Sequence, residues 1–181
     1  PDVIPRGVGN MPLGALGDLR AAEELAGQAE GGFDAVVVGS GSGLTHAGLL
    51  AGLRLAGSEA RVFGGCVRRP AEAQKARIGA VLQALAELLG RDLPIREVDV
   101  QLRDGALAPG YGRLGPRAEA AMRMGARREG LLLDPVYTAK AFAAIPELLE
   151  EGALTRGERV LFVHTGGLAA LFAYEAELRG I

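Results

Sequence analysis

Hydrophobic positions follow two alternating patterns along this chain. Short, nearly continuous apolar runs at residues 33–38, 60–63 and 159–163 are typical of strands buried on both faces. Longer segments carry apolar residues three to four positions apart, the spacing of an amphipathic helix, at residues 18–25, 46–55, 71–89, 117–128, 138–151 and 168–178. Alternating residues at 95–102 predict one more strand, and the run 131–133 predicts a short buried segment.

Strands separated by helices predict a parallel sheet with helices on both faces, an α/β fold of three layers. The glycine- and proline-rich residues 103–116 predict a loop that carries Tyr111. No repeat or linker divides the chain, so residues 1–181 are predicted to form a single domain. Because Pro1 opens directly on strand-and-turn residues, we expect this domain to belong to a larger protein.

Composition narrows the classes of function. Hydrophobic residues make up 49% of the chain, which fits a globular protein, and no apolar run approaches the roughly 20 residues of a membrane span. A net charge of −2 gives no reason to expect a nucleic-acid partner. The single Cys66 cannot form an internal disulfide, which fits a reducing, cytoplasmic compartment, and we interpret it as a buried small residue.

The first strand runs into GSGSGLT at residues 39–45, just before a helix that we expect to begin near His46. Backbone N–H groups at a helix N-terminus favour an anion. The loop lacks the lysine of a Walker motif, and Leu44 breaks the dinucleotide fingerprint G-x-G-x-x-G. The pattern therefore predicts a phosphate site; the alternative is a turn in which glycine only redirects the chain.

The DPVYT motif contains a second group of candidate residues. Asp134 and Pro135 predict a turn, after which Tyr137 would stand at the mouth of the sheet with Thr138 as a helix N-cap. The alternative is a packed tyrosine and an ordinary cap.

The HTGG motif follows the last predicted strand. His164 is a candidate general base, although a lone histidine beside a strand is more often structural. Thr165 is a candidate hydrogen-bonding partner of a ligand ring, and Gly166 would let a ligand approach the backbone. No catalytic triad or metal-ligand spacing is present, so no metal is predicted. Because ligands gather at the carboxyl ends of parallel strands, we expect these motifs and the Tyr111 loop to converge.

The order and combination of these motifs resemble the pyridoxal-phosphate enzymes that include D-cysteine desulfhydrase and 1-aminocyclopropane-1-carboxylate deaminase. The resemblance rests on VIPRGVGNMPLGALG, VVVGSGSGLTHAGLLAGL, LLLDPVYTAKA and VLFVHTGGLAALFAYE, which span nearly the whole chain. It implies a tryptophan-synthase-β-like fold (fold type II of pyridoxal-phosphate enzymes), incomplete here, of which this chain is the C-terminal cofactor-binding portion.

The resemblance also implies residue roles. Tyr137 would stand over the reacting substrate, and Tyr111 would be the second catalytic tyrosine. Thr165 would face the pyridine nitrogen of pyridoxal 5'-phosphate. The cofactor-binding residues it implies are Gly41, Ser42, Gly43, Leu44, Thr45, Thr138, Thr165 and Gly166.

Two positions separate the branches of this family. The cyclopropane deaminases carry a glutamate after the tyrosine of DPVY and a leucine at the threonine of HTGG, whereas this chain has Thr138 and Thr165. The implied reaction is therefore α,β-elimination of cysteine, D-cysteine in this branch, to pyruvate, sulfide and ammonia. L-cysteate or 1-aminocyclopropane-1-carboxylate as the substrate, and a non-catalytic half-fold that binds a phosphate ligand or a protein, remain as alternatives.

This chemistry requires a Schiff-base lysine, and the chain has only Lys75 and Lys140. Lys75 is predicted to be solvated on its helix, and Lys140 occupies a position where the family has a non-catalytic lysine. We therefore expect the Schiff-base lysine in a missing N-terminal half, with which this chain would bind a small amino-acid substrate. The chain alone is expected to be inactive, and the resemblance implies a homodimer.

Overall fold

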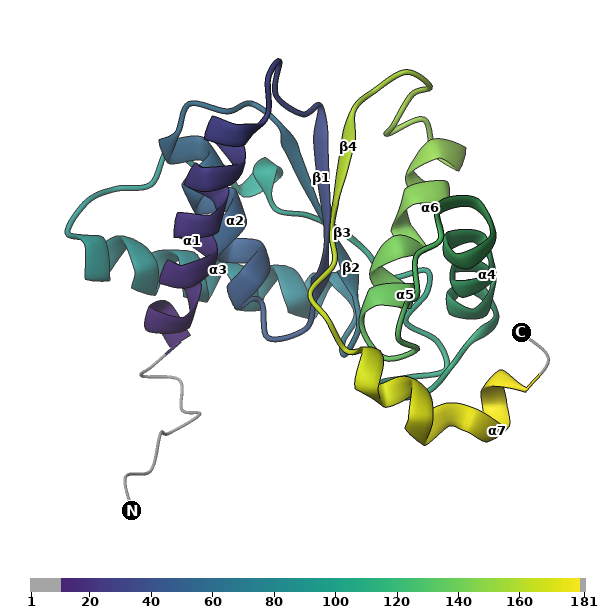
Figure 1. The fold of residues 1–181 in the computed structure, drawn as a ribbon. Coiled ribbons are helices and arrows are strands. Elements are labelled where there is room, and N and C mark those ends of the chain that lie inside the picture. The colour runs from purple at the N-terminus through teal and green to yellow at the C-terminus, as the bar shows by residue number, and fades with distance from the viewer. Residues whose placement is uncertain (1–10, 180–181) are drawn as a thin grey trace.

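A four-stranded parallel sheet in the order β3-β2-β1-β4 forms the centre of the computed structural model, which describes residues 11–179 (Figure 1). Val37 of β1 lies opposite Phe63 of β2 on one side and Phe162 of β4 on the other. Because every pair is parallel, the carboxyl ends of all the strands share one edge. The strands are β1 (Ala35–Ser40), β2 (Arg61–Cys66), β3 (Gln101–Arg103) and β4 (Val160–Val163).

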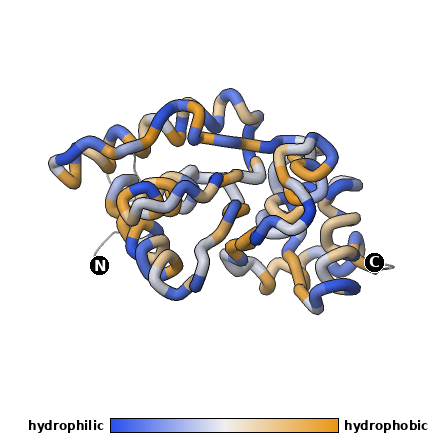
Figure 2. The backbone as a smooth tube through the Cα atoms, turned by 90° about the horizontal axis from the view of Figure 1, so that it is seen from above, coloured by the Kyte–Doolittle hydropathy of each residue, from blue (hydrophilic) through white to orange (hydrophobic). Residues whose placement is uncertain are grey.

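Helices cover both faces of this sheet, which confirms the α/β fold of three layers. One face carries α1 (Met11–Gln28), α2 (Leu44–Leu55) and α3 (Ala71–Leu89). The other carries α4 (Pro116–Met124), α5 (Thr138–Phe142) and α6 (Ala144–Glu150). Alternate residues of β1 enter the two cores: Val36 and Val38 pack with the first group and Val37 with the second. From above, hydrophobic and hydrophilic residues alternate along the helices (Figure 2).

Several predicted boundaries are wrong for identifiable reasons. Most of the predicted strand 95–102 is not a strand, because Glu97–Asp99 forms a 3-10 turn whose Asp99 carboxylate accepts the Arg96 N–H at 2.8 Å. The predicted helix 138–151 is divided into α5 and α6, and Pro146 near the start of α6 has no N–H to continue the earlier helix. The predicted helix 18–25 is longer, and the run 131–133 is neither a strand nor buried throughout.

The end of the chain also differs from its prediction. Residues 168–178 form a 3-10 helix, Leu168–Tyr174, followed by the short α7, Glu175–Leu178. A turn of π-helix, Gly125–Glu129, extends α4. Residues 3–10 of the first motif lie outside the described residues. No helix in the range 11–179 is long and apolar enough to cross a bilayer.

Two glycines inside β2 set how closely the helices approach the sheet. This strand is longer than the predicted run 60–63, since β2 continues through both glycines to Cys66, which is buried as expected. A methyl group on Gly64 would lie 2.4 Å from His46 Nδ1 of α2, and one on Gly65 would lie 2.6 Å from the Ala141 Cα of α5. The backbone of α5 therefore packs directly on β2, and α2 places its His46 ring directly on the other glycine.

Glycines also allow α1 and α2 to touch along their length. A methyl group on Gly48 would lie 2.4 Å from the Ala15 carbonyl oxygen, and one on Gly52 would lie 2.3 Å from that of Leu19. This contact fixes α2, and with it the glycine loop that precedes α2.

We expect Gly52→Ala to lower the free energy of unfolding by about 1–3 kcal/mol, because the added methyl group forces α1 and α2 apart. The matched control is Gly79→Ala on α3, where a methyl group would meet nothing within 4 Å. That variant should be neutral or more stable by about 0.5–1 kcal/mol, since alanine favours the helix. Urea denaturation of both variants makes the measurement, and equal stabilities would contradict the tight contact.

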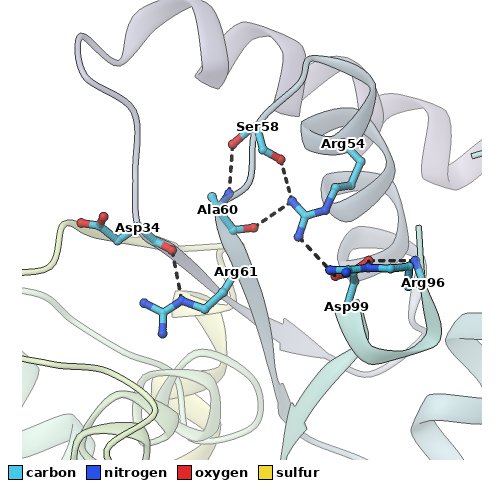
Figure 3. A network of polar contacts seen from close by, with 7 residues as sticks. All are labelled: Asp34, Arg54, Ser58, Ala60, Arg61, Arg96 and Asp99. Carbon is cyan, nitrogen blue, oxygen red and sulfur yellow. Dashed lines mark hydrogen bonds and ion pairs between the residues drawn. The ribbon is translucent and has the colours of Figure 1, made fainter. Parts of the chain in front are cut away.

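A charged network occupies the amino edge of the sheet, opposite the edge expected to bind ligands (Figure 3). Arg54 donates to the carbonyls of Ser58 and Ala60 at 2.7 and 2.9 Å, and its guanidinium lies 3.9 Å from Asp99. Hydrogen bonding to Arg96 lowers the pKa of Asp99. The network holds the turn before β2 and the turn before β3 together, which is a structural role.

Candidate functional site

The loop between β1 and α2 is held from one side. The carbonyl of Ser40 accepts the Val67 N–H at 3.3 Å. The carbonyl of Gly41 accepts Arg69 Nη1 at 2.6 Å. Arg77 Nε reaches the next carbonyl, that of Ser42, at 2.6 Å. Three successive carbonyls thus point toward α3 and the segment that joins it to β2.

The amide groups of the same loop face the other way, because N–H and C=O point in opposite directions across a trans peptide. The N–H groups of Gly41, Ser42 and Gly43 therefore turn away from the arginines. Gly43 has φ 88°, a left-handed conformation that favours glycine, and α2 begins at the next residue. Successive outward N–H groups before a helix N-terminus form a concave anion site, which fits a phosphate.

Leu44 and Thr45 contribute to this anion site through the backbone. A methyl group on Gly14 of α1 would lie 2.9 Å from Leu44 Cδ1, so the leucine side chain packs against α1. The Thr45 hydroxyl hydrogen-bonds the Asp18 carboxylate of α1. Burial raises the pKa of Asp18, and this hydrogen bond offsets part of the rise. The Leu44 N–H donates to Ser42 Oγ at 3.3 Å, and the Thr45 N–H follows it in the first turn of α2, where N–H groups have no partner within the helix.

A chain of polar side chains lies behind the loop. Arg69 Nη1 donates to Gln74 Oε1 at 2.5 Å, and Gln74 Nε2 donates to Ser40 Oγ at 2.9 Å. Ser40 Oγ in turn lies 3.3 Å from Nδ1 of the fully buried His46. Burial lowers the pKa of His46 to about 4, so the ring is neutral near pH 7 and its Nδ1 can accept the serine proton. Sequence reasoning missed Arg69, Arg77 and Gln74 as supports of this loop.

We expect the buried His46 to make folding weaker in mild acid. Its pKa is about 4 in the fold against an ordinary value of 6.5, so the unfolded chain takes up the proton first. The contribution of neutral His46 to the free energy of unfolding is complete above pH 6.5 and is lost as pH falls toward 4. The free energy of unfolding should therefore decrease by about 1.3 kcal/mol between pH 7.5 and 5.5. Urea denaturation at both pH values measures the loss.

His46→Gln should remove this pH dependence, whereas His164→Gln, at the chain's other histidine, should keep it. Burial raises the pKa of Asp18 and of Glu147, and a raised carboxyl pKa stabilises the fold as pH falls. Those two groups therefore cannot produce the loss, and a flat wild-type profile would count against a neutral buried His46.

Tyr137 and Tyr111 form a pair of phenols beside the loop. Their hydroxyl groups hydrogen-bond each other, and their rings meet edge to face with centroids 6.0 Å apart. A methyl group on Gly41 would lie 4.0 Å from Tyr137 Cε1, so this ring borders the anion site. Both side chains are partly open, 39% exposed for Tyr137 and 48% for Tyr111. The structure therefore brings together two tyrosines that lie far apart in the sequence.

The electrostatic surroundings keep Tyr137 protonated. The hydrogen bond to Tyr111 raises the pKa of Tyr137, and burial raises it further. The guanidinium of Arg68 lies 5.7 Å from the Tyr111 ring centroid, and its charge lowers the Tyr137 pKa in part. Tyr137 is thus a neutral proton donor near pH 7. Arg68 is another neighbour that sequence reasoning missed.

Asp134 organises the turn that presents Tyr137. This carboxylate is fully buried and accepts the N–H groups of Val136, Tyr137 and Thr138 at 2.8–2.9 Å. The prediction that Thr138 caps the helix is wrong, because Asp134 binds the free N–H groups and Thr138 is the first residue of α5. The residues before DPVYT, 131–133, belong to no helix or strand.

Thr138 does not present a free hydroxyl to a cofactor. Its side chain is 1% exposed. Its Oγ1 donates to Asp134 Oδ1 at 2.7 Å and accepts the Asp134 N–H at 2.7 Å. The structure therefore does not support the predicted direct contact between Thr138 and the cofactor, because its hydroxyl is used within the turn.

The HTGG turn packs against this aspartate. A methyl group on Gly167 would lie 2.6 Å from Asp134 Oδ1, and both Gly166 and Gly167 have positive φ. His164 Nε2 donates to the Leu132 carbonyl at 2.9 Å, and Nδ1 accepts the Gly166 N–H at 3.3 Å. Both ring nitrogens are engaged, which favours the structural interpretation over a general base. The side chain of Thr165 is exposed.

Neither lysine of the chain has a free amine beside the anion site. Lys75 Nζ pairs with Glu97 at 2.9 Å, and Lys140 Nζ donates to the carbonyls of Leu107 and Gly110 at 3.0 and 2.6 Å. Within residues 11–179 no group of His, Cys, Asp and Glu side chains could hold a metal ion. The described residues therefore offer a phosphate site and two phenols, and no amine.

Comparison with known proteins agrees with this chemistry. The D-cysteine desulfhydrases of Yersinia pestis and of Klebsiella pneumoniae are each 42% identical over 180 residues, which is 98% of this chain and 54% of theirs. A solved structure described as an ACC deaminase homologue superposes with a TM-score of 0.84 at 39% identity, covering 98% of this chain and 52% of that one. The chain thus spans about half the length of these relatives.

The family comparison covers most of the motifs. The model of the pyridoxal-phosphate dependent enzymes matches residues 3–166, from the first motif through the glycine loop and DPVYT to HTGG. The fold-type expectation is confirmed by the structural match. The anion site, the phenol pair and this match lead to one conclusion: the chain belongs to the pyridoxal-phosphate dependent enzyme family.

Proposed function

We propose that this chain is the C-terminal portion of a lyase that converts D-cysteine to pyruvate, sulfide and ammonia with pyridoxal 5'-phosphate. The observation that carries the proposal is the hydrogen-bonded phenol pair, Tyr137 and Tyr111, beside the glycine loop that precedes α2. Thr138 and Thr165 favour the desulfhydrase branch of the family. The cyclopropane deaminases carry glutamate and leucine at these two positions. The similarity to D-cysteine desulfhydrases agrees with this choice.

In this proposal each group has one task. The N–H groups of residues 41–45 bind the cofactor phosphate, and Thr165 faces the pyridine nitrogen. The amine of the proposed Schiff-base lysine would take the Cα proton, and pyridoxal phosphate, when bound, would supply the electron sink for the pair left on Cα. Tyr137 Oη then protonates the sulfur as the Cβ–S bond breaks, and Tyr111 returns a proton through their shared hydrogen bond. Addition of water to the remaining carbon skeleton yields pyruvate and ammonia.

The Schiff-base lysine is proposed to come from an N-terminal half that these 181 residues do not contain. The support is the engagement of both lysines elsewhere, Lys75 with Glu97 and Lys140 with two carbonyls. A homodimer and a cytoplasmic location complete the proposal; they follow from the resemblance and from the single cysteine.

A hybrid enzyme tests the proposal. It consists of the N-terminal half of the Yersinia pestis desulfhydrase fused ahead of this chain, and it is loaded with pyridoxal phosphate. We expect the visible absorbance of lysine-bound cofactor and release of sulfide from D-cysteine. This chain alone should show neither, and a lysine-bound band from the chain alone would contradict the proposed origin of the lysine.

The same hybrid separates the alternatives. Release of sulfite from L-cysteate, or of ammonia from 1-aminocyclopropane-1-carboxylate, without sulfide from D-cysteine would assign a related lyase or deaminase. Failure of the hybrid to bind pyridoxal phosphate would leave a non-catalytic half-fold that binds another phosphate ligand or a protein.

A further inference from the structure

Lys140 is a cation buried without a carboxylate partner among residues 11–179. Its side chain is 1% exposed, and its Nζ donates to the carbonyl oxygens of Leu107 and Gly110. Burial lowers the pKa of Lys140. Because removing an ammonium group from water is costly, the two carbonyl contacts must compensate for a large part of this cost. An apolar side chain would fill the same space without this cost, so packing alone does not explain why a lysine occupies this position.

Both carbonyls belong to the loop that presents Tyr111. Gly110 immediately precedes Tyr111, and residues 104–115 connect β3 to α4. Lys140 also lies in α5, which starts directly after Tyr137. One side chain therefore ties the segment that carries one phenol to the helix that begins at the other.

Other contacts hold the same loop from elements other than α5. Asp104 Oδ2 accepts the Ala71 N–H at 2.9 Å, and Tyr174 Oη donates to the Gly112 carbonyl at 2.5 Å. Neither of these contacts comes from the helix that follows Tyr137. Lys140 is therefore the contact that relates the two phenols to each other.

We propose that Lys140 is a positioning residue, whose ammonium group fixes the Tyr111 loop and so sets the hydrogen bond between Tyr111 and Tyr137. Its importance for turnover rests on the proposed function, whereas its effect on the phenol pair does not. The inference thus assigns a structural role to Lys140, which is not the proposed Schiff-base lysine.

Tyrosine titration tests the geometry directly. The chain has three tyrosines and no tryptophan, so its absorbance change near 295 nm at high pH reports tyrosinate alone. Lys140→Met keeps the length of the side chain and removes the ammonium group, so the carbonyls of Leu107 and Gly110 keep only the backbone N–H groups of Gly110 and Arg113. We expect part of the titration to move to lower pH, toward the curve of Tyr111→Phe, because Tyr137 loses the hydrogen bond that raises its pKa.

Lys75→Met is the matched control, since this lysine lies on α3 and pairs with the exposed Glu97. Its titration should overlay the wild-type curve. If Lys140→Met also overlays the wild type while remaining folded by circular dichroism, the inference is wrong. Sulfide assays on the hybrid add a second readout: a lower kcat supports the inference, and a hybrid inactive from the start leaves the titration result intact.

Wild-type protein provides a test that does not depend on a variant folding. Reductive methylation of the native chain should modify Lys75 at least about tenfold faster than Lys140, because the latter amine is buried and hydrogen-bonded. Peptide mass spectrometry distinguishes the two sites, which are the only lysines. Equal rates would overturn the inference, because they would mean that the ammonium group does not hold the loop.

Discussion

Replacing Tyr137 with phenylalanine should lower kcat of the hybrid enzyme for D-cysteine by about 100-fold or more, the usual contribution of a positioned general acid. The ring remains in place beside Gly41, so binding of the cofactor and substrate should change little. The lost group is the hydroxyl whose pKa Tyr111 raises, and without it the departing sulfur must take its proton from water. Steady-state kinetics with a sulfide assay measure the effect.

Two related variants sharpen this expectation. Tyr111→Phe keeps the Tyr137 hydroxyl and should cost less, about tenfold, because it removes only the relay partner. Tyr174→Phe removes a hydroxyl that bonds the carbonyl of Gly112, the residue after Tyr111, but contacts neither phenol hydroxyl, so activity should stay within a few fold. If Tyr137→Phe retained near-normal kcat, the proton on sulfur would have to come from another group.

The glycine turn between β1 and α2 could be predicted from sequence because it depends on local pattern. The apolar run before the glycines predicts the strand, and the spacing after them predicts the helix. A glycine turn between these elements has few other uses once the nucleotide fingerprints fail. The carboxyl edge of a parallel sheet then predicts that Tyr111 and the other motifs converge there.

The supports of the site could not be predicted in the same way. Arg69 and Arg77 bind loop carbonyls 28 and 35 positions away, and nothing in a basic residue near a proline or within a helix indicates such a partner. Thr138 illustrates the opposite error. A threonine before a helical run fits an N-cap, yet the buried Asp134 satisfies the same N–H groups, so the threonine hydroxyl turns inward.

Strand prediction failed where hydrogen bonds within the chain outweighed the alternation of side chains. Residues 95–102 alternate well enough for a strand, but the Asp99 carboxylate binds the Arg96 backbone and guanidinium and closes a turn. The same aspartate contacts Arg54, so the turn is also fixed from α2. A pattern of alternation contains no information about such a charged partner.

The Asp134→Ala substitution should have the largest effect on stability, a loss of about 3–5 kcal/mol in the free energy of unfolding. It removes the acceptor of three backbone N–H groups and of the Thr138 hydroxyl in a fully buried turn. Each buried donor left without a partner costs about 1–3 kcal/mol, and partial rearrangement offsets some of the sum. Urea denaturation monitored by circular dichroism measures the loss.

Asp104→Ala is the matched control for this substitution. Its carboxylate accepts one N–H, that of Ala71 at the exposed start of α3, so its loss should cost only about 1 kcal/mol. Asp134→Ala should also shift the Tyr137 titration to lower pH, because the turn that orients this phenol toward Tyr111 is no longer fixed. A stability loss no greater than that of Asp104→Ala would mean that water replaces the carboxylate, and that Asp134 does not hold the turn on which the phenol pair depends.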